Sequence, residues 1–125
     1  MINALFPLVA PIAGAGGSAD AYVLANPSDI SLSLDSVSYI DDAGVTASDS
    51  NYATISVELD GVAVASSSTT TTDLGTIAAN TPIAIPVANG NIVVAPGGKV
   101  EIKLAKAGSG VTTAGRCVVV LKPHA

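Results

Sequence analysis

The segment that decides the fold is YATISVELDGVAVA, residues 52–65. Its first eight residues alternate between apolar and polar side chains, which is the period of a strand with one buried face. The apolar set is Ala53, Ile55, Val57 and Leu59. Asp60-Gly61 follows, and this dipeptide between alternating runs favours a type I′ hairpin turn, in which both central residues need a positive φ. The segment predicts a strand over 52–59, a tight turn, and a second strand over 62–65.

The rest of the chain repeats this pattern in shorter pieces. Apolar and polar residues alternate over 30–34 and over 99–104, and a valine-rich run closes the chain over 116–122. Cys117 to Leu121 are continuous enough in apolar character to predict burial on both faces. Further short strands are expected over 22–24, 74–78, 83–87 and 92–94, and residues 37–40 either continue the strand over 30–34 or follow it as a separate one. No segment favours a helix, so we expect an all-β protein, an antiparallel jelly roll or β-sandwich of about eight strands.

The N-terminal segment is apolar and uncharged, but it contains Pro7 and Pro11. The two prolines count against a membrane-spanning helix, and the lack of a preceding basic residue counts against a signal peptide. We therefore expect an extended apolar arm over 1–20, joined by glycines to a β domain over 21–125. The arm would cover a neighbouring subunit or shell with its large apolar side chains: Ile2, Leu5, Phe6, Leu8, Val9 and Ile12. Tyr52, on the polar face of its strand, is expected to be a further subunit contact.

Charge is unevenly distributed. The net charge is −5, and all five Lys and Arg residues lie at or beyond Lys99. An acidic chain of this kind is not expected to bind nucleic acid, which requires a clustered basic surface. Lys99, Lys103 and Lys106 are expected on a solvated strand face, with an acidic partner surface as the alternative.

The residues that carry catalysis are scarce. The chain has one histidine, His124, one cysteine, Cys117, and no tryptophan. We therefore expect no enzyme activity, no cofactor and no metal site, and a buried, unreactive Cys117. The acids in the loop from Asp41 to Ser50 offer oxygen ligands, but their spacing does not match a calcium loop, and turn residues are the simpler interpretation. Because aromatic residues make up only 3% of the chain, the core must be thin, which favours a homo-oligomer.

The segment from Asp49 to Val57, DSNYATISV, resembles the Asn-Tyr-containing strand of small jelly-roll head decoration (cement) proteins of tailed bacteriophages. The order of the later features, up to Leu121, is similar to that family as well. The resemblance implies a homotrimer on the outer surface of a virion, bound to the major capsid protein and stabilising the head, away from membranes. Because similar modules occur in phage tails, the alternative is a tail-spike, fibre or adhesin module that recognises a host glycan.

Overall fold

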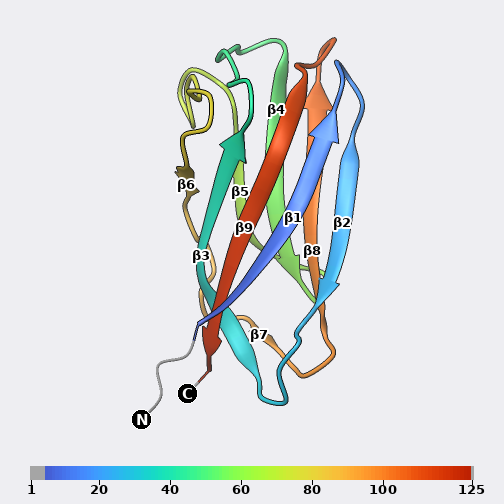
Figure 1. Cartoon of the computed structure of the whole chain (residues 1–125), viewed down its shortest axis with the longest axis vertical. Helices are drawn as coiled ribbons and strands as arrows, with labels where there is room; N and C mark the ends of the chain where they lie inside the picture. Colours follow the sequence, from blue (N-terminus) through green and yellow to red (C-terminus); the bar gives the residue numbers. More distant parts are fainter. Residues whose placement is uncertain (1–4, 125) are drawn as a thin grey trace.

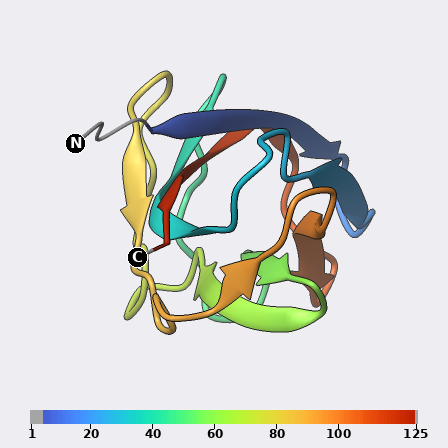
Figure 2. The ribbon, with the colours of Figure 1, turned by 90° about the horizontal axis from the view of Figure 1, so that it is seen from below.

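A computed structural model describes residues 5–124, and it contains no helix in that range. The nine strands are β1 (Phe6–Gly14), β2 (Asp20–Ala25), β3 (Leu32–Asp41), β4 (Tyr52–Leu59), β5 (Val62–Ser68), β6 (Ile83–Ile85), β7 (Val93–Val94), β8 (Lys99–Ala107) and β9 (Thr113–Pro123). They form two antiparallel sheets that face each other across the core (Figures 1 and 2). The five-stranded sheet has the order β1-β9-β3-β6 with β7 beside β3, and the four-stranded sheet has the order β2-β8-β4-β5. The predicted antiparallel β-sandwich is confirmed.

The strands pair in a nested way. β4 and β5 form a hairpin, and moving outward from it along the chain β3 pairs with β6, β2 with β8, and β1 with β9. The outermost pair brings Phe6 opposite Leu121, so both ends of the described chain lie at the lower end of the sandwich (Figure 1). On one side of the sandwich, a bridge between Ala65 and Val87 ties the segment after β6 to β5, which joins the two sheets.

The core between the sheets is built from alternate residues of the long strands. The four apolar residues predicted to share one face of β4 are all fully buried, and so are Val100 and Ile102 of β8. Cys117, Val119 and Leu121 of β9 meet them from the other sheet. Tyr39 is the one aromatic side chain among the fully buried core residues of the described chain, so the core is otherwise aliphatic, as the composition predicts.

The turn between β4 and β5 has the predicted geometry. Asp60 has a φ of 49° and Gly61 a φ of 84°, so both central residues are left-handed. This is the requirement of a type I′ turn, whose twist matches that of the strands it joins. The hairpin prediction is confirmed.

The predicted arm is wrong for Phe6–Gly14, because these residues form β1. All nine pair with β9, and Ala10 and Ile12 are fully buried in the core. The two prolines do not interrupt the strand because it lies at the edge of its sheet, where a missing N–H breaks no ladder bond. Residues 1–4 lie outside the described range.

One smaller strand prediction is wrong, because residues 74–78 form only an isolated bridge, from Ile77 to Val45. Of the two alternatives for 37–40, the structure shows that these residues continue the preceding strand: both segments lie in β3, whose register on β9 shifts between Leu34 and Ser36. This irregularity explains why the alternation in the sequence breaks at that point.

Candidate contact surface

The outer face of the five-stranded sheet is apolar where β1 lies on β9. Val9 pairs with Val118 and Pro7 pairs with Val120, so apolar side chains stand opposite each other on the outside as well as on the inside. We call this surface the valine face, and it consists of Pro7 and Val9 on β1 and Val118 and Val120 on β9, with Pro11 at its margin. Polar residues border it, because Arg116 stands opposite Pro11 and the serines Ser36 and Ser38 of β3 stand opposite Val120 and Val118. Val9 is 52% exposed, whereas Val118 and Val120 are half-buried by their neighbours.

The structure divides the predicted contact residues between two environments. Leu5 and Val9 are exposed, which is compatible with a contact role. Ile12 is fully buried in the protein's own core, so the prediction is wrong for this residue. Phe6 and Leu8 are half-buried and pack against the same core. Ile2 lies outside the described residues.

Tyr52 is half-buried on the outer face of the other sheet, opposite Ala107 of β8. It is therefore far from β1 in the strand order, because β4 and β1 belong to different sheets. The predicted contact residues do not form one continuous surface.

Val118 and Val120 are the members of the valine face that the sequence prediction missed. Their apolar run predicted burial on both faces of β9, but only Cys117, Val119 and Leu121 point into the core. The predicted second covering layer is absent from the described part of the chain, so the outward valines are half-exposed. The apolar run over 117–121 is visible in the sequence. The run alone does not show whether the outer face of β9 is covered by this chain or by another protein.

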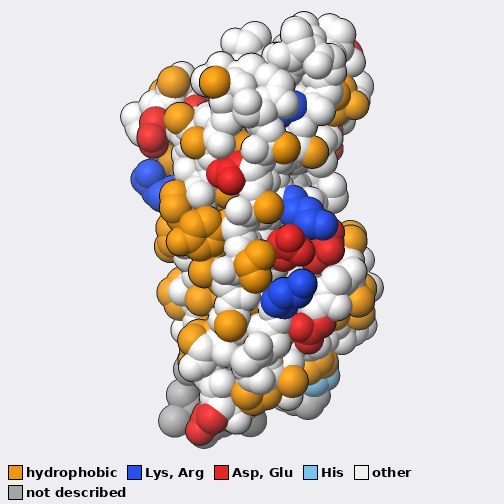
Figure 3. Space-filling view, turned by 90° about the vertical axis from the view of Figure 1, so that its right-hand side faces the viewer, with side chains coloured by type: hydrophobic (Ala, Val, Ile, Leu, Met, Phe, Trp, Pro, Cys, Tyr) orange, Lys and Arg blue, Asp and Glu red, His pale blue; other side chains and the backbone are white. Residues whose placement is uncertain are grey.

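The outer face of the four-stranded sheet is polar. Lys103 Nζ lies 2.9 Å from Glu58 Oε2 and 4.0 Å from Glu101 Oε1. The hydrogen bond to Glu58, with the charge of Glu101, raises the pKa of Lys103. Figure 3 looks at the side of the molecule on which β2 lies. Hydrophobic side chains gather toward the left of that view, and Lys and Asp or Glu side chains alternate down its centre.

Lys106 does not belong to this polar face. It continues the inward-pointing series of β8, and its Nζ donates to the carbonyls of Gly14, Gly16 and Val111 at 2.9, 3.1 and 2.7 Å. Partial burial lowers its pKa. Lys106 therefore holds two loops together at one end of the sandwich. The expectation that Lys99, Lys103 and Lys106 share a solvated face is wrong for Lys106.

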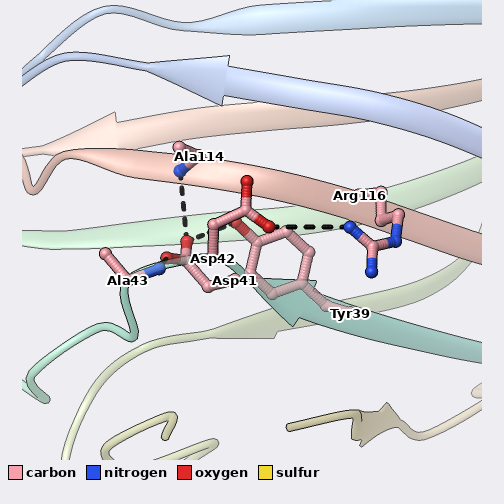
Figure 4. A network of polar contacts seen from close by, with 6 residues as sticks. All are labelled: Tyr39, Asp41, Asp42, Ala43, Ala114 and Arg116. Carbon is pink, nitrogen blue, oxygen red and sulfur yellow. Dashed lines mark hydrogen bonds and ion pairs between the residues drawn. The ribbon is translucent and has the colours of Figure 1, made fainter. Parts of the chain in front are cut away.

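The loop that begins at Asp41 is held by a buried carboxylate (Figure 4). Asp41 Oδ2 accepts from the Tyr39 hydroxyl at 2.7 Å and from the Ala114 N–H at 3.2 Å, and Oδ1 accepts from the Ala43 N–H at 3.0 Å. Burial, together with the hydrogen bond to Asp41, raises the pKa of Tyr39, so its hydroxyl stays protonated and available as a donor. Asp41 thus fixes the ends of β3 and β9 to each other.

The neighbouring acids also have partners within the chain. Asp42 pairs with Arg116 at 3.5 Å (Figure 4). Asp49 accepts from the backbone and hydroxyl of Thr71, and these bonds lower the pKa of Asp49. Among residues 5–124, no group of three or more His, Cys, Asp or Glu side chains is placed to hold a metal ion. Asp41, Asp42 and Asp49 therefore stabilise the structure of the loop and its surroundings.

The remaining candidates for chemistry are isolated. Cys117 is fully buried, and burial raises the pKa of its thiol from 9.0 to about 12. The prediction of a buried Cys117 is confirmed. His124 is exposed at the end of the described chain, where its N–H donates to the Ser31 carbonyl at 3.1 Å. One shallow, open depression lies beside the start of β2, lined by Ala19, Asp20, Ala21, Lys103, Leu104 and Ala105.

No described helix is long and apolar enough to cross a membrane. Comparisons with protein-family models, curated proteins and solved structures found no match to this chain.

Proposed function

We propose that this chain is a structural virion protein, a decoration (cement) protein that binds the outside of a phage head and stabilises it without catalysing a reaction. Its partner would be the major capsid protein. The observation that carries the proposal is the valine face, a sheet surface with apolar side chains where a strand exposed to water normally alternates with polar ones. Such a surface is typical of a protein that is covered in its working state.

The valine face has the chemistry that a static attachment requires. Full burial of an exposed valine side chain contributes about 1.5–3 kcal/mol before the cost of association. Val9 is 52% exposed and Val118 and Val120 are half-buried, so each contributes only part of that amount. The face lies on paired strands, so little conformational entropy is lost when it binds. Prolines at positions 7 and 11 stiffen it further. A rigid apolar face suits permanent attachment better than release and rebinding.

The connectivity supports the same proposal. We interpret the nested pairing of β1 with β9, β2 with β8, β3 with β6 and β4 with β5 as a jelly roll, the fold implied by the resemblance of residues 49–57 to head decoration proteins.

Two measurements test the proposal. Mass spectrometry of virions purified from the phage that encodes the chain should detect it, and immunogold labelling should place it on the head. Absence from virions would contradict the proposed function, and a label confined to the tail would favour the tail-module alternative.

A binding experiment then tests the surface. The double variant Val9→Glu, Val118→Glu should bind undecorated heads at least tenfold more weakly than the unaltered chain, because it places two charges in an apolar contact. Val62→Glu is the matched control, since Val62 is 43% exposed but lies on β5, outside the valine face. Both variants should remain folded by circular dichroism, and the double variant should unfold at a lower denaturant concentration than the control because Val118 is half-buried. Unchanged binding of the double variant would exclude the valine face as the attachment surface.

A further inference from the structure

Three of the four lateral strand edges are closed to pairing with another strand. At the edge of β1, the Ala13 N–H donates to Asp20 Oδ2 at 3.1 Å. Hydrogen-bonding directions alternate along a strand, so Pro7 and Pro11 direct their nitrogens to the same edge, where they offer no N–H. β6 lies between Pro82 and Pro86, and the edge of β5 carries the bridge from Ala65 to Val87. These are features by which natural sheets avoid association at their edges.

Beyond Asp20, whose side chain accepts from the Ala13 N–H of β1, the edge of β2 lacks these features. The strand contains no proline. The Asn26 N–H donates to the Gly98 carbonyl at 2.9 Å and continues the register of β2 on β8. Alternation therefore turns the backbone groups of Tyr22 and Leu24 toward β8 and those of Val23 toward the free edge. The Ala21 N–H faces the same free edge. It donates to Asp20 Oδ1 of the neighbouring residue at 2.9 Å rather than to a carbonyl of β8, which agrees with this assignment.

The side chains of this edge are apolar and exposed. Six large hydrophobic residues in the described chain are exposed, and four of them lie on β2 or on and just before β1. On β2 these are Tyr22, 38% exposed, and Val23, 55% exposed. A strand with exposed apolar side chains and unpaired backbone groups at its edge can pair with a further strand.

The strand is complementary to itself. Its sequence from 21 to 25 is AYVLA. An antiparallel copy related by a two-fold axis at Val23 places Ala21 opposite Ala25 and Tyr22 opposite Leu24, which is a favourable pairing of an aromatic with an aliphatic side chain. Asp20 comes to lie opposite Asn26, so the pairing sets no like charges against each other.

The surface beside β2 also has room for the partner. In an antiparallel pairing centred on Val23, the numbers of two opposed residues add up to twice 23. Residue 27 of the partner therefore lies opposite residue 19, so the partner's Asn26-Pro27 turn comes close to Ala19. The shallow depression next to β2 lies at this place, and its floor includes the small side chains of Ala19, Ala21 and Ala105.

We propose that two copies of this chain pair through β2, antiparallel about a two-fold axis at Val23, so that their four-stranded sheets become one continuous sheet. The Val23 N–H of each copy donates to the Val23 carbonyl of the other. A two-fold contact of this kind closes on itself and forms a dimer. It replaces the three-fold arrangement implied by the resemblance, and it is independent of the proposed capsid role because it is measured on the free protein.

Light scattering during size-exclusion chromatography at micromolar concentrations tests the pairing. The unaltered chain should have twice the mass of one 12.2 kDa chain. Val23→Lys should raise the dissociation constant of the dimer at least tenfold, because two lysines would face each other across the axis with their Cα atoms about 5.5 Å apart. Val62→Lys, at another exposed valine, should leave the dimer unchanged. A monomeric or trimeric unaltered chain, or a Val23→Lys dimer of unchanged affinity, would overturn the proposal.

A second variant covers the case in which Val23→Lys fails to fold. Val23→Cys keeps the edge apolar, and a short thiol-to-thiol linker should join two copies at this position. Val62→Cys is the control and should not be joined, and the native Cys117 does not interfere because it is buried. Equal cross-linking of the two variants, or none of Val23→Cys, would overturn the proposal.

Discussion

Asp41 shows how a single polar residue can define the end of a β-sandwich. It lies in β3 with only 1% of its surface exposed, and its two oxygens accept from a side chain and from two loop or strand N–H groups. Its own carbonyl accepts from the Asn80 N–H at 2.7 Å. Gly115 is required beside it, because any side chain there would collide with the Ile40 carbonyl. The sequence predicted a turn at Asp41 but not this network, since the partners are far apart in the chain.

The network predicts the effect of removing one hydroxyl. Tyr39→Phe should lower the free energy of unfolding by about 1–3 kcal/mol, because a buried acceptor loses a donor at 2.7 Å. Denaturant titration followed by circular dichroism measures the change. Tyr52→Phe is the matched control, because Tyr52 is half-buried on an outer face. Removal of its hydroxyl should change the free energy of unfolding by less than about 0.5 kcal/mol. Equal effects of the two substitutions would mean that the Tyr39 hydroxyl adds nothing.

The buried thiol of Cys117 predicts that the free energy of unfolding depends on pH. Burial raises the pKa of its thiol to about 12 in the folded protein, from 9.0 when it is exposed. Between these values the folded state holds the proton more tightly than the unfolded state, so this thiol's contribution to stability is complete below pH 9 and is lost as the pH rises toward 12. Cys117→Ser should therefore show a smaller loss of stability between pH 9 and 11 than the unaltered chain. Parallel pH profiles of the two proteins would contradict this.

At the scale of elements, strands with polar outer faces could be predicted and β1 could not. β4 has the predicted bounds, Tyr52–Leu59, because its outward residues are polar and the alternation is visible. In β1 the inward positions are Phe6, Leu8, Ala10 and Ile12, but the outward positions are apolar too, and two of them are prolines. Because the outward positions of β1 are not polar, the sequence shows no alternation of apolar and polar residues there. The same apolar outward residues form part of the valine face.

The contact role predicted for the apolar N-terminal segment stays a prediction for Leu5 and Val9, which are exposed. The sequence could not separate them from Ile12, which is buried in the core. Val118 and Val120 could not be identified from the sequence, because a run of apolar residues does not say whether one or both of its faces meet the protein's own core. Pairing across the sheet supplies that information, since it sets Val9 against Val118.

The assignment of β1 as a core strand predicts different effects for its two faces. Ile12→Ala should lower the free energy of unfolding by about 2–5 kcal/mol, because Ile12 is fully buried. Val9→Ala, on the same strand but 52% exposed, should cost less than about 1 kcal/mol. Thermal and denaturant unfolding of both variants measures the difference. Small effects at both positions would mean that β1 is a detachable arm after all.

At the scale of the whole molecule, the nested pairing makes the contacts long-range. Residues 6–14 pair with residues 113–121, so the first and last strands must meet before the five-stranded sheet is complete. Loop-closure entropy and folding rates depend on such separations, and sandwiches with non-local pairing fold in milliseconds to seconds. The nearness of Phe6 to Leu121 also means that a short connection could join the two ends.

A circular permutant uses this geometry to test the topology. The two ends are joined by a short Gly/Ser linker, and the chain is opened between Gly90 and Asn91, which are both exposed. The permutant should fold to the same sandwich, because every strand pair is retained and only the connections change. Pairing of β1 with β9 then closes a loop of about ten residues instead of about a hundred, which lowers the closure cost by roughly 2 kcal/mol. If that pair forms before the rate-limiting step, stopped-flow refolding should be faster by at least several-fold than for the unaltered order. A permutant that does not fold would show that the β1–β9 pairing is not as described, whereas a folded permutant with an unchanged refolding rate would place that pairing after the rate-limiting step.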